Sequence, residues 1–377
     1  MFPDHHWTCL SLPPRHFAWR VRGNSLSWAF NHRQTLTDNY DLLIATSLAD
    51  LSSLRGFVPE LARLPTLVYF HENQFAYPIR PSRPAKSTSG AVADIEKTRQ
   101  SNLVNAQLTS LYAALCADRI VFNSDWNRHS FFAGLDALLN KLPDEVPAGL
   151  SQQLQANSSV LAVPLPDRLY AGDSCMDSDT RRPNSADRIL QIVWNHRHEY
   201  DKGPTLLLAI VQRLVARGLR FRLHLLGQRF RQAPEEFDQL RALLATHYRD
   251  QGMAPGLDAW IGSRDEYETL LSKSDIVLST AQHDFQGLSI LEGMARGCMP
   301  LAPDALAYPE YIDEAFLYPV EGLTITEQAD AACARIISWQ HQGQKPGSNR
   351  STIDVSRFSA TAMQAPWATL LDSLIDS

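Results

Sequence analysis

The chain has 377 residues, a length that favours two domains of about 150 residues each. Its 44% hydrophobic and 20% charged residues are typical of globular proteins and exclude a chain that is disordered throughout. No apolar run reaches the roughly 20 residues of a membrane span, and the first residues lack the basic and apolar parts of a secretory leader. The five cysteines are odd in number and widely spaced, which fits a reducing compartment. We therefore expect a cytoplasmic protein that does not contact a membrane.

The net charge of −6 is unevenly distributed. Residues 1–166 contain 14 Lys and Arg against 13 Asp and Glu, whereas the remainder contains 21 against 28. A polyanionic partner would therefore have to bind the N-terminal half.

Short apolar runs in the first half predict buried strands at 42–46, 66–70, 119–122 and 160–163, with a helix at 97–116. The segment 78–96 lies between the second and third of these strands and contains several Pro and Ser residues. We therefore expect 78–96 to be one long loop. In the second half we expect strands at 189–194, 221–226, 258–261, 276–279 and 299–302, and helices at about 203–217, 233–248, 265–273 and 287–297. This alternation, occurring twice, predicts an α/β protein with two parallel sheets.

The polar segment 167–188 has no periodicity and predicts a linker. It divides the chain into an N-terminal domain at 1–166 and a C-terminal domain at 189–355. The last segment, 358–377, predicts a closing helix that is broken near Pro366.

A loop that follows strand 189–194 contains two cations, Arg197 and Lys202, before the start of a helix. A guanidinium, an ammonium and the backbone N–H groups at a helix start together suit a diphosphate. A solvated basic loop is the alternative for this pair taken alone.

A pair of acidic residues follows strand 276–279. Asp284 lies in the loop, Gly287 opens a helix, and Glu292 lies in that helix with seven residues between the two acids. We expect Asp284 to face the end of the strand, the backbone N–H groups of 286–289 to face an anion, and Glu292 to accept hydrogen bonds from a sugar diol.

Together these residues give 189–304 a resemblance to the nucleotide-sugar domain of retaining glycosyltransferases of family 4, which have the GT-B fold. Arg197 and Lys202 match the Arg and Lys of that family, Glu292 matches the second of its paired glutamates, and Asp284 replaces the first. The resemblance implies two Rossmann-like domains whose parallel sheets face a central cleft, with a C-terminal helix at 356–377 that returns to the N-terminal domain. It also implies a donor site formed by Arg197, Lys202, Asp284, Phe285, Gln286, Gly287, Leu288 and Glu292.

A narrower resemblance covers nearly the whole chain and includes 16–22, 69–74, 122–124, 192–197, 226–230 and 308–310. These stretches are similar to the tRNA-queuosine mannosyltransferases. The resemblance implies transfer of mannose from GDP-mannose to the cyclopentenediol of queuosine in the anticodon of tRNA(Asp). Members of that family begin with a strand and a Gly-containing loop that this sequence lacks. We therefore expect an internal start codon or a truncated chain, which mass spectrometry of the native N-terminus would test.

The resemblance implies that His71 contacts the donor sugar and that His71, Arg197, Lys202 and Asp284 are the catalytic group. For His71, the alternative is a capping or core histidine. Glu72 and Asn73 would orient the acceptor, or cap a loop.

The tRNA would bind the N-terminal domain, where Arg15, Arg20 and Arg22 alternate with Phe17 and Trp19. Arg80, Arg83 and Lys86 could add phosphate contacts. A solvated face with ordinary core aromatics is the alternative, because no RNA-binding motif is present.

We expect no metal and no cofactor other than the nucleotide sugar, because the protein's own cations would neutralise the diphosphate. Asp177 and Asp179 resemble a metal-binding pair, but a solvated acidic loop explains them better. His196 and His198 flank Arg197, whose charge opposes a cation there. Two other functions stay open: a transferase that acts on a saccharide or lipid, and a tRNA-binding protein without catalysis.

Overall fold

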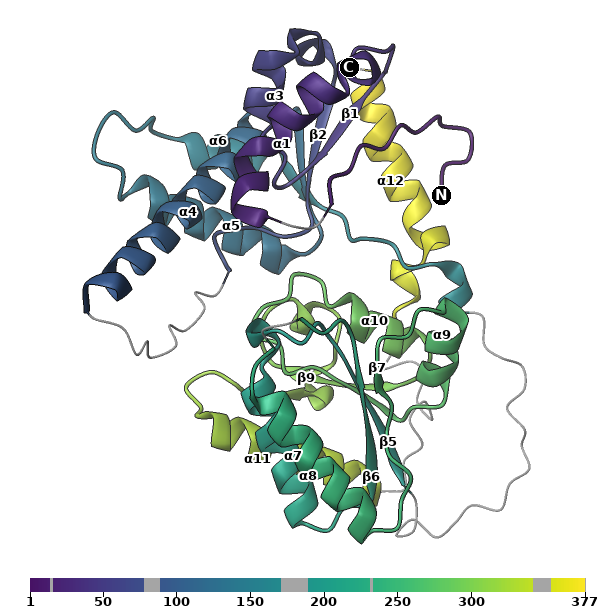
Figure 1. Ribbon diagram of the computed structural model, residues 1–377. Helices are drawn as coiled ribbons and strands as arrows, with labels where there is room; N and C mark the ends of the chain where they lie inside the picture. The colour runs from purple at the N-terminus through teal and green to yellow at the C-terminus, as the bar shows by residue number, and fades with distance from the viewer. Residues whose placement is uncertain (14–15, 78–88, 171–188, 231–232, 342–353, 377) are drawn as a thin grey trace. The chain divides into compact units, whose positions relative to one another are not determined.

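The computed structural model describes residues 1–13, 16–77, 89–170, 189–230, 233–341 and 354–376. It divides into an N-terminal unit, Met1–Val163 with Met363–Ser377, and a C-terminal unit, Pro164–Ala362. Each unit contains a parallel sheet with helices packed on it (Figure 1). Among the described residues, no helix combines the length and apolar character needed to cross a membrane.

The N-terminal unit is built on a parallel sheet of four strands in the order β1-β2-β3-β4. Its elements are α1 (Phe17–Asn31), α2 (Arg33–Leu36), β1 (Leu43–Thr46), α3 (Leu51–Phe57), β2 (Thr66–Phe70), α4 (Ser89–Leu115), β3 (Arg119–Phe122), α5 (Asp125–Leu139), α6 (Leu150–Ala156), β4 (Ser158–Val160) and most of α12 (Ala360–Ile375). Phe70 and Phe122 pack with helices α4 and α5 on one face, while Leu67 and Val121 pack with α12 on the other. Strands buried on both faces explain why they appear in the sequence as continuous apolar runs.

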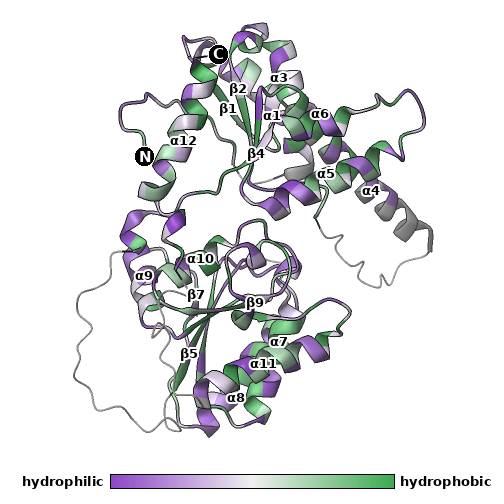
Figure 2. Ribbon diagram, turned by 180° about the vertical axis from the view of Figure 1, so that it is seen from behind, coloured by the Kyte–Doolittle hydropathy of each residue, from purple (hydrophilic) through white to green (hydrophobic). Residues whose placement is uncertain are grey.

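The C-terminal unit contains a parallel sheet in the order β10-β9-β8-β5-β6-β7. Its elements are β5 (Leu190–Asn195), α7 (Pro204–Ala216), β6 (Phe221–Leu226), α8 (Glu236–Asp250), β7 (Asp258–Ala259), α9 (Arg264–Ser272), β8 (Ile276–Leu278), α10 (Leu288–Ala295), β9 (Met299–Pro303), β10 (Leu317–Tyr318) and α11 (Ile325–His341), with short 3-10 helices η2 (Asp167–Leu169), η3 (Tyr200–Lys202), η4 (Tyr308–Glu310), η5 (Glu314–Phe316) and η7 (Ser356–Phe358). Helices α7, α8 and α11 cover one face of the sheet, and α9 and α10 cover the other. Figure 2 shows hydrophobic residues along the strands, whereas a covering helix such as α8 alternates between hydrophobic and hydrophilic residues.

Three local predictions were wrong. The strand expected at 160–163 lies earlier in the chain, as β4 at Ser158–Val160. The loop expected at 78–96 ends earlier, because α4 begins at Ser89; the segment after Ser89 has no proline and several alanines, which favour a helix. The break expected near Pro366 does not occur, since α12 continues through that residue. Packing compensates for the missing backbone bond: the Trp367 ring lies 5.4 Å from the Tyr69 ring, and Leu374 is buried against the sheet.

The second boundary between the units lies inside α12 and not at residue 356. Just before it, Ser359 pairs with Leu165, and the Thr361 hydroxyl donates to Asp167, which holds 356–362 in the C-terminal unit. The predicted linker starts as the 3-10 helix η2, whose Leu169 is buried in the core; residues 171–188 lie outside the described residues.

Candidate active site

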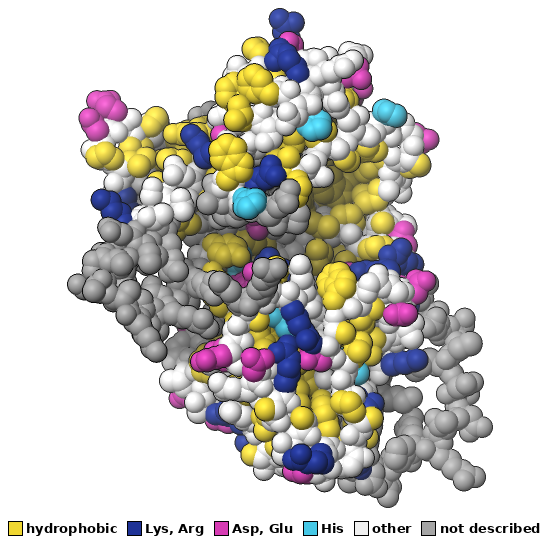
Figure 3. All heavy atoms as spheres, viewed as in Figure 1, with side chains coloured by type: hydrophobic (Ala, Val, Ile, Leu, Met, Phe, Trp, Pro, Cys, Tyr) yellow, Lys and Arg dark blue, Asp and Glu magenta, His cyan; other side chains and the backbone are white. Residues whose placement is uncertain are grey.

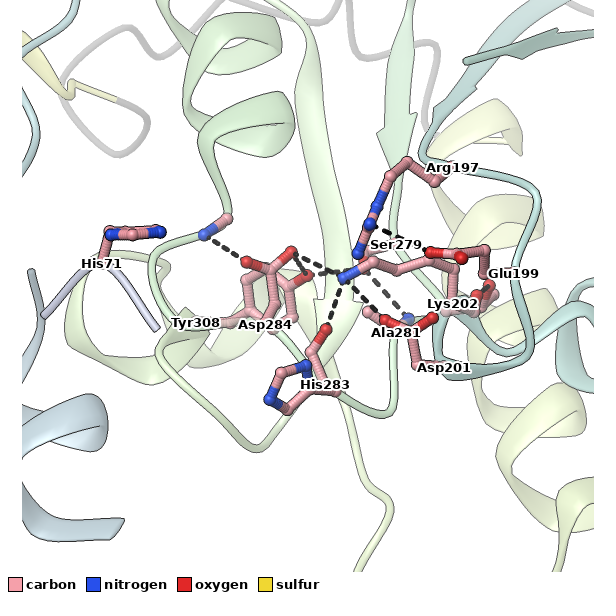
Figure 4. A network of polar contacts seen from close by, with 12 residues as sticks. His71, Arg197, Glu199, Asp201, Lys202, Ser279, Ala281, His283, Asp284 and Tyr308 are labelled. Carbon is pink, nitrogen blue, oxygen red and sulfur yellow. Dashed lines mark hydrogen bonds and ion pairs between the residues drawn. The ribbon is translucent and has the colours of Figure 1, made fainter. Parts of the chain in front are cut away.

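The loop after β5 brings Lys202 into a buried group of charges (Figure 4). Its Nζ atom donates to the His283 carbonyl oxygen at 2.6 Å and lies 3.4 Å from Asp201 and 4.0 Å from Asp284. The Lys202 side chain is only 11% exposed. A buried ammonium between two carboxylates is a fixed positive charge, and its position is set before any ligand arrives.

Gly203 allows this loop to approach the end of β8 closely. The residue has a φ of 65°, and a Cβ atom there would lie 1.9 Å from the Thr280 carbonyl oxygen. Thr280 in turn donates its hydroxyl to the Lys202 carbonyl and accepts a hydrogen bond from the Trp194 indole. The segment 196–203, called the Lys202 loop below, is therefore hydrogen-bonded directly to the residues that follow β8.

Asp284 is held in place by its own loop. It accepts a hydrogen bond from the Gly287 N–H at 2.8 Å and one from the Tyr308 hydroxyl at 3.2 Å. Burial alone would raise the pKa of Asp284, but the Lys202 charge and these two hydrogen bonds hold that pKa below its usual value. Asp284 is thus a carboxylate at neutral pH.

Two histidines beside Lys202 are neutral. Burial and the Lys202 charge lower the pKa of His196 to about 3 and that of His283 to about 4. Around Lys202, the positive charge therefore comes from the ammonium of Lys202 and not from the imidazoles, which are uncharged at neutral pH.

Arg197 is placed differently. Its side chain is 51% exposed and lies 3.1 Å from Glu199, and Figure 4 shows it extending toward Lys202. The Arg197 charge also contributes to the lowered pKa of His283. The two cations predicted to bind a diphosphate therefore lie near each other: Lys202 is fixed and Arg197 is accessible.

The remaining predicted donor residues surround the start of α10. Phe285 and Gln286 are buried, while Leu288 is 40% exposed. Gly287 has a φ of 71°, and a Cβ atom there would meet Tyr311 and Tyr308. These residues hold the loop in shape, and the first turn of α10 leaves N–H groups for an anion.

Glu292 lies farther along α10 in a separate polar network. Its carboxylate accepts from the Arg264 guanidinium at 2.5 Å and from the Tyr267 hydroxyl at 2.7 Å. Within the described residues, its connection to the Lys202 loop passes through Tyr267 to Asn195, the last residue of β5.

In the N-terminal unit, His71 is exposed after β2 and Glu72 is half-buried. Asn73 is fully buried: its amide nitrogen donates to Asn127 and Ser130, and its oxygen accepts from the N–H groups of Phe75 and Ala76. Of the two roles expected for Asn73, this geometry matches loop capping and leaves no free amide donor for an acceptor molecule.

Helix α1 carries the predicted RNA-binding residues that the structure describes. Trp19 is 55% exposed and its indole lies against Gly23, where a Cβ atom would be 2.5 Å away. Arg22 is 52% exposed and lies 3.7 Å from Asp50, while Arg20 is half-buried. Figure 3 shows hydrophobic and basic side chains next to one another over this helix. Arg15, Arg80, Arg83 and Lys86 lie outside the described residues, as do Asp177 and Asp179.

Comparison with known proteins identifies both halves of the chain. The N-terminal profile of the tRNA-queuosine alpha-mannosyltransferases matches residues 2–165, and the profile of glycosyl transferases group 1 matches 189–341. A tRNA-queuosine alpha-mannosyltransferase of Drosophila melanogaster is 30% identical over 322 residues, which cover 85% of this chain and 76% of that protein. The chain belongs to the tRNA-queuosine alpha-mannosyltransferase family.

Solved structures agree on the fold of this family member. Sucrose-phosphate synthase from Thermosynechococcus elongatus matches with a TM-score of 0.63 and 14% identity, over 97% of this chain and 81% of that one. A UDP-forming trehalose-phosphate synthase from Burkholderia xenovorans gives 0.61 and 16%, over 97% and 80%. This likeness shows the GT-B fold, and membership of the family shows that the chain is a hexosyltransferase.

Several residues of the site carried no assigned role in the sequence analysis. Tyr308 belongs to a stretch that resembles the family, yet only the structure shows that its hydroxyl donates to Asp284. Tyr267 and Arg264, which hold Glu292, and Asp201, which flanks Lys202, had no motif to mark them. Among the described residues, no group of three or more His, Cys, Asp and Glu is arranged to hold a metal ion.

Proposed function

We propose that this enzyme transfers mannose from GDP-mannose to the cyclopentenediol of queuosine in the anticodon of tRNA(Asp), with retention of configuration. Membership of the family supports the class of acceptor, and the fixed charge of Lys202 beside Asp284 supports a sugar-diphosphate donor. Because mannose is α-linked in GDP-mannose, an enzyme of an alpha-mannosyltransferase family would form its product with retention.

The reaction breaks the bond between mannose C1 and the β-phosphate oxygen, and GDP leaves with the bonding electrons. A hydroxyl oxygen of the cyclopentenediol forms the new bond to C1 on the same face of the sugar, and the proton of that hydroxyl passes to the departing phosphate oxygen. Negative charge therefore grows on the diphosphate while C1 takes on oxocarbenium character. Lys202 and Arg197 stabilise this charge, and each such contact contributes about 3 kcal/mol, by analogy with single oxyanion donors. The first N–H groups of α10 assist.

Two acids orient the donor. Asp284, ionised and held by Gly287 and Tyr308, accepts hydrogen bonds from the hexose hydroxyls. Glu292 accepts hydrogen bonds from the ribose, since a carboxylate has about four acceptor positions and the network on α9 uses two of them. A separate metal ion is not required in this scheme, because protein cations carry the balancing charge.

The acceptor tRNA binds the N-terminal unit through α1. Trp19 offers an exposed indole for stacking on an unpaired base, and Arg20 and Arg22 contact phosphates. The contact of His71 with the donor sugar stays a prediction.

The deciding experiment incubates the purified protein with GDP-mannose and queuosine-containing tRNA(Asp), then digests the RNA and analyses the nucleosides by mass spectrometry. We expect queuosine to gain one hexose, and the same tRNA carrying guanosine at that position to gain none. Absence of the hexose from queuosine, with transfer to a saccharide or lipid acceptor instead, would contradict the proposal.

A further inference from the structure

The network around Glu292 has a defined direction. Asn195 donates its amide N–H to the Tyr267 hydroxyl oxygen at 2.6 Å, and the Tyr267 hydroxyl is 2.7 Å from Glu292. A phenol has a single proton, and because its oxygen already accepts from Asn195, that proton points to Glu292. The chain of donors therefore runs from the end of β5, through α9, to the acid on α10.

The surroundings keep Tyr267 in this role. The residue is 8% exposed, and burial together with the Glu292 charge raises the pKa of Tyr267 above its usual value, so the phenol stays protonated. The Arg264 guanidinium lies 5.1 Å from the centre of the Tyr267 ring and also binds the other oxygen of Glu292. Each carboxylate oxygen is thus fixed by one neighbour.

We propose that Tyr267 is a positioning residue for the donor ribose: it orients Glu292 so that the free acceptor positions of the carboxylate face the ribose hydroxyls. This inference rests on the proposed function, in which Glu292 binds that ribose. It also gives Asn195 a role, since Asn195 lies two residues before Arg197 and links the diphosphate-binding loop to the ribose-binding acid.

The substitution Tyr267→Phe isolates this role. The Tyr267 ring packs in the core between the sheet and α9 and α10, and phenylalanine keeps that packing while it removes the hydroxyl. Tyr248→Phe is the matched control: Tyr248 is also buried in the C-terminal unit, but its hydroxyl bonds the backbone of Leu223.

The test compares the dissociation constants of GDP and 2′,3′-dideoxy-GDP by calorimetry. We expect the wild type and Tyr248→Phe to prefer GDP by about tenfold or more, as for hydrogen bonds to a charged group. In Tyr267→Phe the preference should fall to about threefold or less, through weaker binding of GDP and an almost unchanged affinity for the dideoxy nucleotide. Asn195→Ala should lower the preference in the same direction, which supplies a second variant should Tyr267→Phe fold poorly.

Two failures are distinguishable. If the wild type binds GDP but Tyr267→Phe keeps the full preference, or loses affinity for both nucleotides equally, Tyr267 does not position the ribose-binding acid and the inference is wrong. If the wild type binds neither nucleotide, the proposed function is overturned and this inference with it.

Discussion

The two units of this enzyme hold their functional side chains in opposite ways. In the C-terminal unit, Lys202 is buried between Asp201 and Asp284, and Glu292 is fixed by Arg264 and Tyr267. In the N-terminal unit, two of the RNA-binding candidates on α1 are exposed: Trp19 is 55% exposed, and Arg22 is half exposed with one carboxylate 3.7 Å away.

The proposed function, in which the C-terminal unit binds the donor and the N-terminal unit binds the tRNA, explains this difference. A small charged donor requires fixed charges at strand ends, whose cost of burial is offset by mutual pairing. An RNA surface requires accessible cations and aromatic rings that can adapt, and such side chains need few partners within the protein. Substitutions in the two units should therefore have different effects on donor binding, tRNA binding and stability.

The largest effect is expected from Lys202→Ala. Removal of the ammonium takes away the fixed charge that would stabilise the leaving diphosphate, so kcat for mannose transfer should fall about 100-fold or more. Asp201 and Asp284 also lose their counter-charge, and the free energy of unfolding should fall by about 3 kcal/mol. Lys273→Ala, an exposed lysine at the end of α9, should change neither quantity. Activity of Lys202→Ala within tenfold of the wild type would remove Lys202 from the mechanism.

A smaller effect, confined to RNA, is expected from the double variant Arg20→Ala, Arg22→Ala. The loss of two phosphate contacts should weaken tRNA binding by about tenfold. The association constant should also depend less steeply on salt, with the slope of its logarithm against log salt concentration becoming less negative by about 1.4. GDP binding should not change. Arg119→Ala, an exposed arginine at the start of β3, serves as the control. An unchanged salt slope would show that α1 is not the RNA-binding face.

Acid should destabilise the C-terminal unit before the N-terminal one. The described histidines of the N-terminal unit are exposed, whereas His196, His198, His224 and His283 are buried, and burial lowers each of their pKa values to between about 3 and 4. Because the unfolded chain takes up protons near pH 6.5 and the folded one only near pH 4 or below, stability falls as the pH drops through this range.

Hydrogen exchange at pH 7 and pH 5, corrected for the intrinsic rate, should therefore show a greater loss of protection in peptides from β5 and β6 than in those from β2 and β3. The variant His224→Gln should reduce that loss, since glutamine does not titrate. Equal changes in both units would contradict the role assigned to the buried histidines.

The smallest effect is expected from removal of metal ions. If Lys202 and Arg197 neutralise the diphosphate, EDTA should change the transfer rate by less than twofold. Activity that disappears in EDTA and returns with magnesium would mean that the protein cations are insufficient.

The strands that carry the candidate site were predictable because parallel strands are apolar on both faces. The runs at 189–194 and 276–279 overlap β5 and β8, and Lys202 and Asp284 follow these two strand ends as expected. The two-residue strand β10 is too short to leave a pattern. The start of α4 was missed because the prolines before it dominated the segment.

The partners of the site residues were not predictable by the same reasoning. Asn195 and Tyr267 are 72 positions apart, and Tyr308 is 24 positions from Asp284, so no local spacing reveals either contact. For Asn73 the sequence allowed both acceptor binding and loop capping, and the burial and hydrogen bonds of its amide favour loop capping. Spacing identifies candidate groups along one loop or helix, while the groups that hold them come from elements far away in the sequence.

The close approach at Gly203 limits how this enzyme can be redesigned. With the Thr280 carbonyl 1.9 Å from where any Cβ atom would lie, the loop cannot be diversified at that position without separating two strand ends. A library that seeks a new sugar or nucleotide preference should therefore leave 202–203 and 280 untouched and vary an accessible side chain of the site, such as Leu288, instead.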